Sequence, residues 1–117
     1  MTYVDGFIVP VPKKKVAAYK KIATLAGKIW MEHGALSYVE AVADDVKPGK
    51  WTSFPQSVKL KKGEVVIFSY ITYKSRKSRD VVMKKVMSDK RLKMDMSTMP
   101  FDGKRMIFGG FKAIVEK

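Results

Sequence analysis

The stretch EVVIFSYITY, residues 64–73, is the strongest strand signal in the chain. β-Branched and aromatic residues dominate it, which is typical of strands. Because it is apolar almost throughout, it favours a central strand of a sheet. Successive side chains point to opposite faces, and the set that begins at Val65 and the set that begins at Val66 are both largely apolar. We therefore expect a sheet with two faces that avoid water.

The segments around this strand alternate between strand and helix patterns. Strands are predicted at 3–11, at 36–44 and, last in the chain, at 104–115. Apolar side chains recur every three or four residues over 13–33, and a second helix is predicted at about 76–88. The order β-α-β-β-α-β predicts the ferredoxin-like α+β fold, an antiparallel sheet with two helices on one face.

Short local signals mark the ends of these elements. Pro10 and Pro12 are expected to end the first strand, and Gly34 the first helix, because glycine adopts a left-handed cap easily. The Ser75 hydroxyl is expected to cap the second helix. The pair Gly109-Gly110 lies inside the last strand and suggests a bulge or close packing against another backbone.

The length and composition of the chain limit what the protein is. Its 117 residues lack repeats and linkers, so residues 1–117 are predicted to form a single domain. No window reaches the roughly 20 apolar residues of a membrane helix, and the basic run follows the N-terminal apolar stretch, the reverse of a signal peptide. We expect a cytoplasmic protein that does not enter a membrane.

Several classes of chemistry are excluded. The chain has no cysteine, which excludes disulfides, thiolate zinc sites and cysteine nucleophiles, and a single histidine, which excludes a His-pair metal motif. No phosphate loop, nucleophile elbow or dinucleotide fingerprint is present. No metal and no cofactor are therefore predicted.

One face of the expected sheet needs a further covering. Two helices cover one face of four strands, and an apolar face left in water is rare in proteins. The simplest arrangement is a homodimer in which two sheets pack face to face about a two-fold axis. The alternative is that the long loop at 45–63 covers the face within one chain.

Nearly the whole chain resembles the YbaA-like family of small bacterial proteins of unknown function. The similar stretches are YVDGFIVPVPKKK at 3–15, EHGALSYVEAVADDVKPG at 32–49, TSFPQSVK at 52–59, YKSRKSRD at 73–80 and MPFDGKRMIFGGFK at 99–112. The resemblance implies a dimeric α/β barrel and implies no reaction. The wider superfamily of that fold includes monooxygenases, haem-degrading enzymes and small-molecule binders, which is an analogy of fold alone.

The candidate catalytic residues are His33, Asp5 and Glu40. His33 ends the first helix and is either a capping residue or a general base or haem ligand that faces a cavity. Trp30 lies one turn earlier on the same face. Asp5 and Glu40 fall in apolar strands, where a carboxylate is either ion-paired or acts on a substrate. If Asp5 faces the helices, we expect it to meet His33 or Arg105.

The candidate ligand-binding residues are Trp30, Tyr70 and Arg105. Arg105 follows the turn pair Asp102-Gly103 and either holds an anionic ligand or forms an interface ion pair. Together these residues predict a cavity between sheet and helices that binds or transforms a small organic molecule. Whether the protein is an enzyme is left open; acid–base chemistry or cofactor-independent oxygenation is the form expected of one.

The charge of the chain supports a different function. The net charge is +13, and residues 59–117 contribute +10 of it, from 16 basic and 6 acidic residues. RNA-recognition modules share this order of elements, but Glu64 follows Lys62-Gly63 where that module has an aromatic residue. The alternative is therefore a non-enzymatic protein that binds nucleic acid or other anions through the second helix. Its binding residues are Lys74, Arg76, Lys77, Arg79, Lys84 and Lys85.

Overall fold

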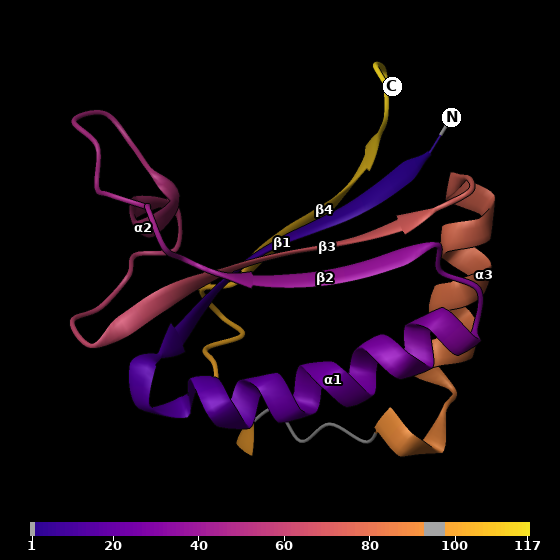
Figure 1. The fold of residues 1–117 in the computed structure, drawn as a ribbon, viewed down its shortest axis with the longest axis horizontal. Helices are drawn as coiled ribbons and strands as arrows, with labels where there is room; N and C mark the ends of the chain where they lie inside the picture. The colour runs from indigo at the N-terminus through magenta and orange to yellow at the C-terminus, as the bar shows by residue number, and fades with distance from the viewer. Residues whose placement is uncertain (1, 93–97) are drawn as a thin grey trace.

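An antiparallel sheet of four strands is the framework of the computed structural model, which describes residues 2–92 and 98–117 (Figure 1). Its strands are β1 (Tyr3–Pro12), β2 (Ser37–Val42), β3 (Glu64–Tyr73) and β4 (Ile107–Lys112). The sheet order is β2-β3-β1-β4, so β3 is an inner strand, as its apolar sequence predicts. The α+β class and the antiparallel sheet are confirmed.

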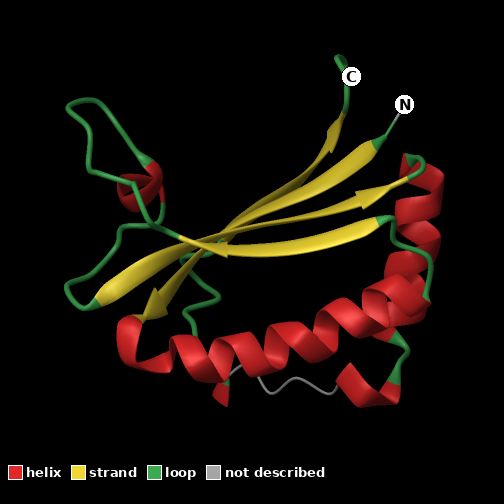
Figure 2. Ribbon diagram, in the orientation of Figure 1, coloured by secondary structure: helices red, strands yellow, loops and turns green. Residues whose placement is uncertain are grey.

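Two long helices, α1 (Val16–Glu32) and α3 (Arg76–Met87), pack against the same side of the sheet (Figure 2). Ile29 of α1 and Val86 of α3 are fully buried against Tyr73 in one cluster of the core. At the other end of the sheet, Tyr19 and Ala23 of α1 pack with Ile67. The odd-numbered residues of β3 therefore face the helices. None of the described helices is long and apolar enough to cross a membrane.

The structure differs from the sequence-based prediction in the two prolines of β1, the length of the last strand and the role of Gly110, and β2 and α1 are each slightly shorter than predicted. Pro10 and Pro12 lie within β1, because beyond Ile8 that strand pairs with β3 alone and a proline is tolerated where no second strand needs its N–H. The last strand is shorter than the predicted 104–115. Gly110 forms no bulge; it makes room for the Tyr3 ring, which an added Cβ would overlap.

The predicted helix caps at Ser75 and Gly34 are confirmed, and the long loop between β2 and β3 contains a short helix. The Ser75 hydroxyl accepts a hydrogen bond from the Ser78 N–H at 3.1 Å, as a cap of α3. Gly34 has a φ of 117° directly after α1, as expected of a left-handed cap. Between β2 and β3, residues 54–57 form the short helix α2 (Phe54–Ser57), and 3-10 turns occur at 13–15 and 90–92.

The central part of the sheet face opposite the helices carries no charged side chain. Three rows of register partners cross it, and α2 covers only one end, where the Phe54 and Phe68 rings lie 5.9 Å apart. Phe68, Ile107 and Phe111 are 43%, 45% and 62% exposed. We call it the open face, defined by Ser37, Thr72, Val4, Phe111, Val39, Tyr70, Gly6, Gly109, Ala41, Phe68, Ile8 and Ile107.

Arg105 joins the start of β4 to the start of β3. Its guanidinium donates to both carboxylate oxygens of Glu64 at 2.8 and 2.6 Å, and to Asp102 at 2.8 Å. It also donates to the carbonyl oxygens of Val58 and Lys59. Both members of the Arg105–Glu64 pair are largely buried, and the arginine holds the pKa of Glu64 below its usual value.

We expect Glu64→Gln to lower the free energy of unfolding by about 1–3 kcal/mol at pH 7, because a buried two-bond ion pair is lost. The pKa of Glu64 is lower in the folded chain than in the unfolded chain. The contribution of Glu64 to the free energy of unfolding is therefore complete above about pH 5, and it is lost as the pH falls through the pKa of the folded state. Urea denaturation from pH 7 to pH 3 measures the gap between the two proteins. If the difference in the free energy of unfolding between wild type and Glu64→Gln does not narrow at low pH, the stabilising role of the Arg105–Glu64 ion pair is contradicted.

Candidate functional site

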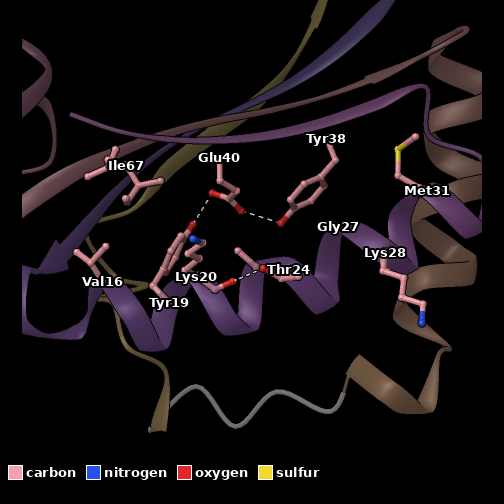
Figure 3. A pocket seen from close by; sticks show the side chains of 12 residues that line it. Val16, Tyr19, Lys20, Thr24, Gly27, Lys28, Met31, Tyr38, Glu40 and Ile67 are labelled. Carbon is pink, nitrogen blue, oxygen red and sulfur yellow. Dashed lines mark hydrogen bonds between the residues drawn. The ribbon is translucent and has the colours of Figure 1, made fainter. Parts of the chain in front are cut away.

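Glu40 of β2 points toward α1 and accepts hydrogen bonds from two tyrosines (Figure 3). The Tyr19 and Tyr38 hydroxyls each donate to one of its carboxylate oxygens, both at 2.7 Å. Tyr38 and Glu40 are two residues apart on one strand, so they share a face, and Tyr19 reaches them from α1. The three side chains form one polar group in otherwise apolar surroundings, which we call the Glu40 cluster.

The two tyrosines of the Glu40 cluster are fixed as proton donors. Burial raises the pKa of Tyr19 far above its usual value, and the nearby charge of Glu40 raises it further. The pKa of Tyr38 is raised by the same two causes, with burial again the larger. Both phenols are therefore protonated at neutral pH, and Glu40 is the acceptor of the cluster.

Two hollows meet at the Glu40 cluster. The outer pocket, between α1 and the edge of β2, has a volume of about 550 Å³, and Lys20 and Lys28 line it together with apolar residues. The inner cavity lies between α1 and the sheet, with a volume of about 260 Å³. Four residues line both spaces, which are Tyr19, Ala23, Tyr38 and Glu40. The carboxylate thus reaches a solvent-accessible pocket on one side and a mostly apolar space between the helices and the sheet on the other.

A glycine in α1 gives Tyr38 its place. A Cβ added at Gly27 would lie 2.8 Å from the Tyr38 ring, so only glycine allows the ring to lie against the helix. Glycine inside a helix costs about 1 kcal/mol relative to alanine. This close packing explains a helix-breaking residue in the middle of α1.

The inner cavity has a lining of aromatic and thioether side chains. The Trp30 ring lies 6.0 Å from the Tyr38 ring, and the Phe101 ring packs edge-on against Tyr19 at 5.8 Å. The methionines that line it are Met83, Met87, Met99 and Met106. The described lining includes no lysine, arginine or histidine, so Glu40 is the charged group at this cavity among the residues that the structure describes.

Trp30 and Asp5 belong to a second polar group next to the cavity. The Trp30 Nε1–H donates to the Tyr73 hydroxyl at 3.1 Å. Burial raises the pKa of Tyr73, and the charge of Asp5 raises it further. Asp5 is 5% exposed, and its partner is Arg79 at 2.9 Å rather than His33 or Arg105. Asp5 does face the helices, but an arginine of α3 neutralises it.

His33 lies outside both hollows. Its Nε2 is 2.9 Å from an Asp89 oxygen beyond α3, and its side chain is 26% exposed. Arg91 and then His33 hold the pKa of Asp89 well below its usual value. His33 therefore joins the ends of the two long helices and contacts neither the Glu40 cluster nor the inner cavity.

The other candidate ligand residues are separated from Glu40. Tyr70 lies on the open face, on the far side of the sheet from the inner cavity. The guanidinium of Arg105 is engaged by two carboxylates and two carbonyls, as described above. Of the six residues, the structure brings Glu40 and Trp30 to one cavity. Tyr19 and Tyr38 are not among the residues predicted from the sequence, although a tyrosine two residues before a strand glutamate shares its face of the sheet.

The basic residues around α3 mostly point to solvent. Lys74, Arg76, Lys77, Lys84 and Lys85 are exposed. Arg79 departs from the predicted anion-binding surface, because it is half-buried and paired with Asp5 and Asp80. The candidate anion surface therefore consists of five side chains rather than six.

Comparison with known proteins places the chain in a family. Residues 2–103 match the family described as protein of unknown function, DUF1428. The proteins named Uncharacterized protein YbaA from Escherichia coli K12 and from Shigella flexneri are each 49% identical over 117 residues, which is all of both chains. The structure of Rv0793 from Mycobacterium tuberculosis aligns with 99% of this chain and 98% of its own, at 14% identity and a TM-score of 0.46. The chain therefore belongs to the DUF1428 family of proteins of unknown function, and the YbaA-like resemblance of its sequence is confirmed.

Proposed function

We propose that the protein binds a small organic molecule between α1 and the sheet and that Glu40 is the group that acts on it. One observation supports this above all: the Glu40 carboxylate, held by two protonated tyrosines, lies where the outer pocket meets the inner cavity. An apolar hollow with a few convergent polar groups is the usual form of a small-molecule site. The outer pocket offers a route from solvent to the carboxylate.

The Glu40 cluster is suited to acid–base chemistry. A carboxylate within hydrogen-bond reach of a bound molecule accepts a proton from it, which is the role of a general base. The Tyr19 and Tyr38 hydroxyls hold the two oxygens in fixed positions, so the base does not have to reorient when a molecule enters. Binding and proton transfer at Glu40 are the activities that we propose for this site.

The proposed site is tested first by placing a larger side chain where the outer pocket meets the inner cavity. Ala23 is 8% exposed and lines both spaces, so Ala23→Leu is expected to place three extra carbon atoms in the path of a ligand. With the neutral fluorescent probe N-phenyl-1-naphthylamine, we expect this variant to weaken binding at least about tenfold, the cost of roughly 1.4 kcal/mol.

The matched control is Ala18→Leu, the same change on the exposed side of α1. It is expected to bind the probe as the wild type does. Circular dichroism confirms that each variant is folded. Probe binding that is equal in Ala23→Leu and wild type would mean that the dye binds elsewhere, and it would contradict the proposed site.

We extend the proposal to the ferredoxin-like dimeric barrel that the family resemblance implies. The strand order β2-β3-β1-β4 with both long helices on one side supports the ferredoxin-like arrangement. The twelve residues of the open face carry no charge, although the chain carries +13, which supports a second copy as the covering of that face.

Light scattering at micromolar concentration is expected to give twice the mass of one 13.3 kDa chain. Phe111→Asp is expected to give the single-chain mass, because it would bury two carboxylates in a face-to-face interface. The matched control is Lys112→Asp, the neighbouring position of β4, whose side chain points to the other face. A wild-type protein of single-chain mass contradicts the dimer.

A second candidate function is electrostatic binding of nucleic acid by the exposed basic residues of α3 and its N-terminal flank. Counterion release predicts that the logarithm of the affinity for mixed-sequence RNA falls linearly with the logarithm of salt concentration. The triple change of Lys77, Lys84 and Lys85 to Gln is expected to reduce that slope by about three. The same triple change at Lys14, Lys15 and Lys21 is the control. Lack of binding at about 50 mM salt excludes this function.

A further inference from the structure

We infer that the ligand class of the inner cavity is a neutral one- or two-ring aromatic molecule with a hydroxyl group, whose O–H donates to Glu40. This inference rests on the proposed function and specifies its ligand. It follows from the hydrogen-bonding capacity, the charge and the lining of the cavity.

Glu40 has acceptor capacity to spare. A carboxylate offers about four lone-pair positions, and the two tyrosines use one on each oxygen. Both tyrosines donate their single hydroxyl hydrogen to Glu40, so a ligand that only accepts hydrogen bonds would find no free donor among them. A ligand that donates an O–H completes the cluster, and hydrogen bonds to a charged acceptor are among the stronger ones in proteins.

The charge of the cavity selects against anions. Its described lining contains Glu40 and no basic side chain. An anion placed there would lie beside a negative carboxylate, and the described lining offers no opposite charge to compensate the loss of water. Lys20 and Lys28 lie in the outer pocket instead. A neutral donor is therefore favoured at the inner cavity.

The size and lining of the cavity favour an aromatic frame. An apolar cavity of about 150 Å³ accommodates benzene, and the inner cavity is about 260 Å³. Thioethers and aromatic rings both make favourable contacts with an aromatic ring, and Met83, Met87 and Met106 line this space with Trp30. Unbranched methionines also adjust to rings of different shape, so a class of molecules is expected rather than one compound.

Calorimetric titration with three naphthalenes of equal ring size tests the inference. They are 2-naphthol, a neutral donor; 2-methoxynaphthalene, which cannot donate; and 2-naphthoate, an anion. In wild-type protein we expect 2-naphthol to bind about tenfold or more tightly than either of the others, from one hydrogen bond to a charged acceptor. This comparison needs no variant, so it does not depend on how a mutant folds.

The indole N–H resonances locate the bound probe. The chain has two tryptophans: Trp30 lines the inner cavity, and Trp51 is 86% exposed. We expect 2-naphthol to shift the Trp30 Nε1–H signal and leave that of Trp51 unchanged; Trp51→Phe assigns the two signals. In Glu40→Gln, which keeps the shape of the side chain, the preference for 2-naphthol over 2-methoxynaphthalene is expected to disappear.

Each other outcome overturns the inference in a distinguishable way. If 2-naphthol and 2-methoxynaphthalene bind alike and Ala23→Leu weakens the binding of both, the cavity binds small molecules but does not select them by hydrogen-bond donation to Glu40. In that case the proposed function stands and the inference fails. If 2-naphthoate binds most tightly, the ligand is an anion. If no naphthalene binds and N-phenyl-1-naphthylamine also fails, the inference and the proposed function both fail.

Discussion

A sheet of four strands has two apolar faces here, and the two long helices cover only one of them. The odd-numbered side chains of β3 enter the core with α1 and α3, and the even-numbered ones reach the open face, of which α2 covers only the end near Phe68. This limit divides the molecule into a side where Asp5 and Glu40 lie beneath the helices and a side whose twelve open-face residues carry no charge. The ligand site and the dimer contact that we propose thus lie on opposite faces.

The buried carboxylates of the fold have two kinds of partner. Asp5 is neutralised by Arg79, and Glu64 by Arg105, so the charges of these two are compensated within the fold. Glu40 has two phenols instead, which stabilise its charge through hydrogen bonds without cancelling it. Because its charge is not cancelled and it borders two hollows, Glu40 differs from the other two in what it can do for a bound molecule.

The sequence predicts the fold better than the site, and the reason is physical. Apolar periodicity is a local property, so β3, α1 and α3 were predicted to within three residues at each end. The choice of partner for a buried charge depends on side chains from distant elements: Arg79 lies 74 residues from Asp5 and was predicted to bind anions. His33 and Arg105 were selected by residue type, and both join elements of the fold. For Glu40, a carboxylate in an apolar strand is unfavourable without a partner, and this local property is enough to mark it as a candidate, although its two tyrosine partners are not predicted.

The two prolines of β1 affect whether a strand of another molecule can pair with the edge of this sheet. The Lys13 N–H donates to the Gly63 carbonyl in the register of β1 with β3, so the nitrogens of Pro10 and Pro12 point to the other edge, past the end of β4. An open strand edge is a template on which a foreign strand adds and aggregation begins. Past the end of β4, the edge of β1 lacks two of the donors that such a strand would need, and the Pro10 ring is also fully buried there. The prolines thus act as a stop against further growth of the sheet.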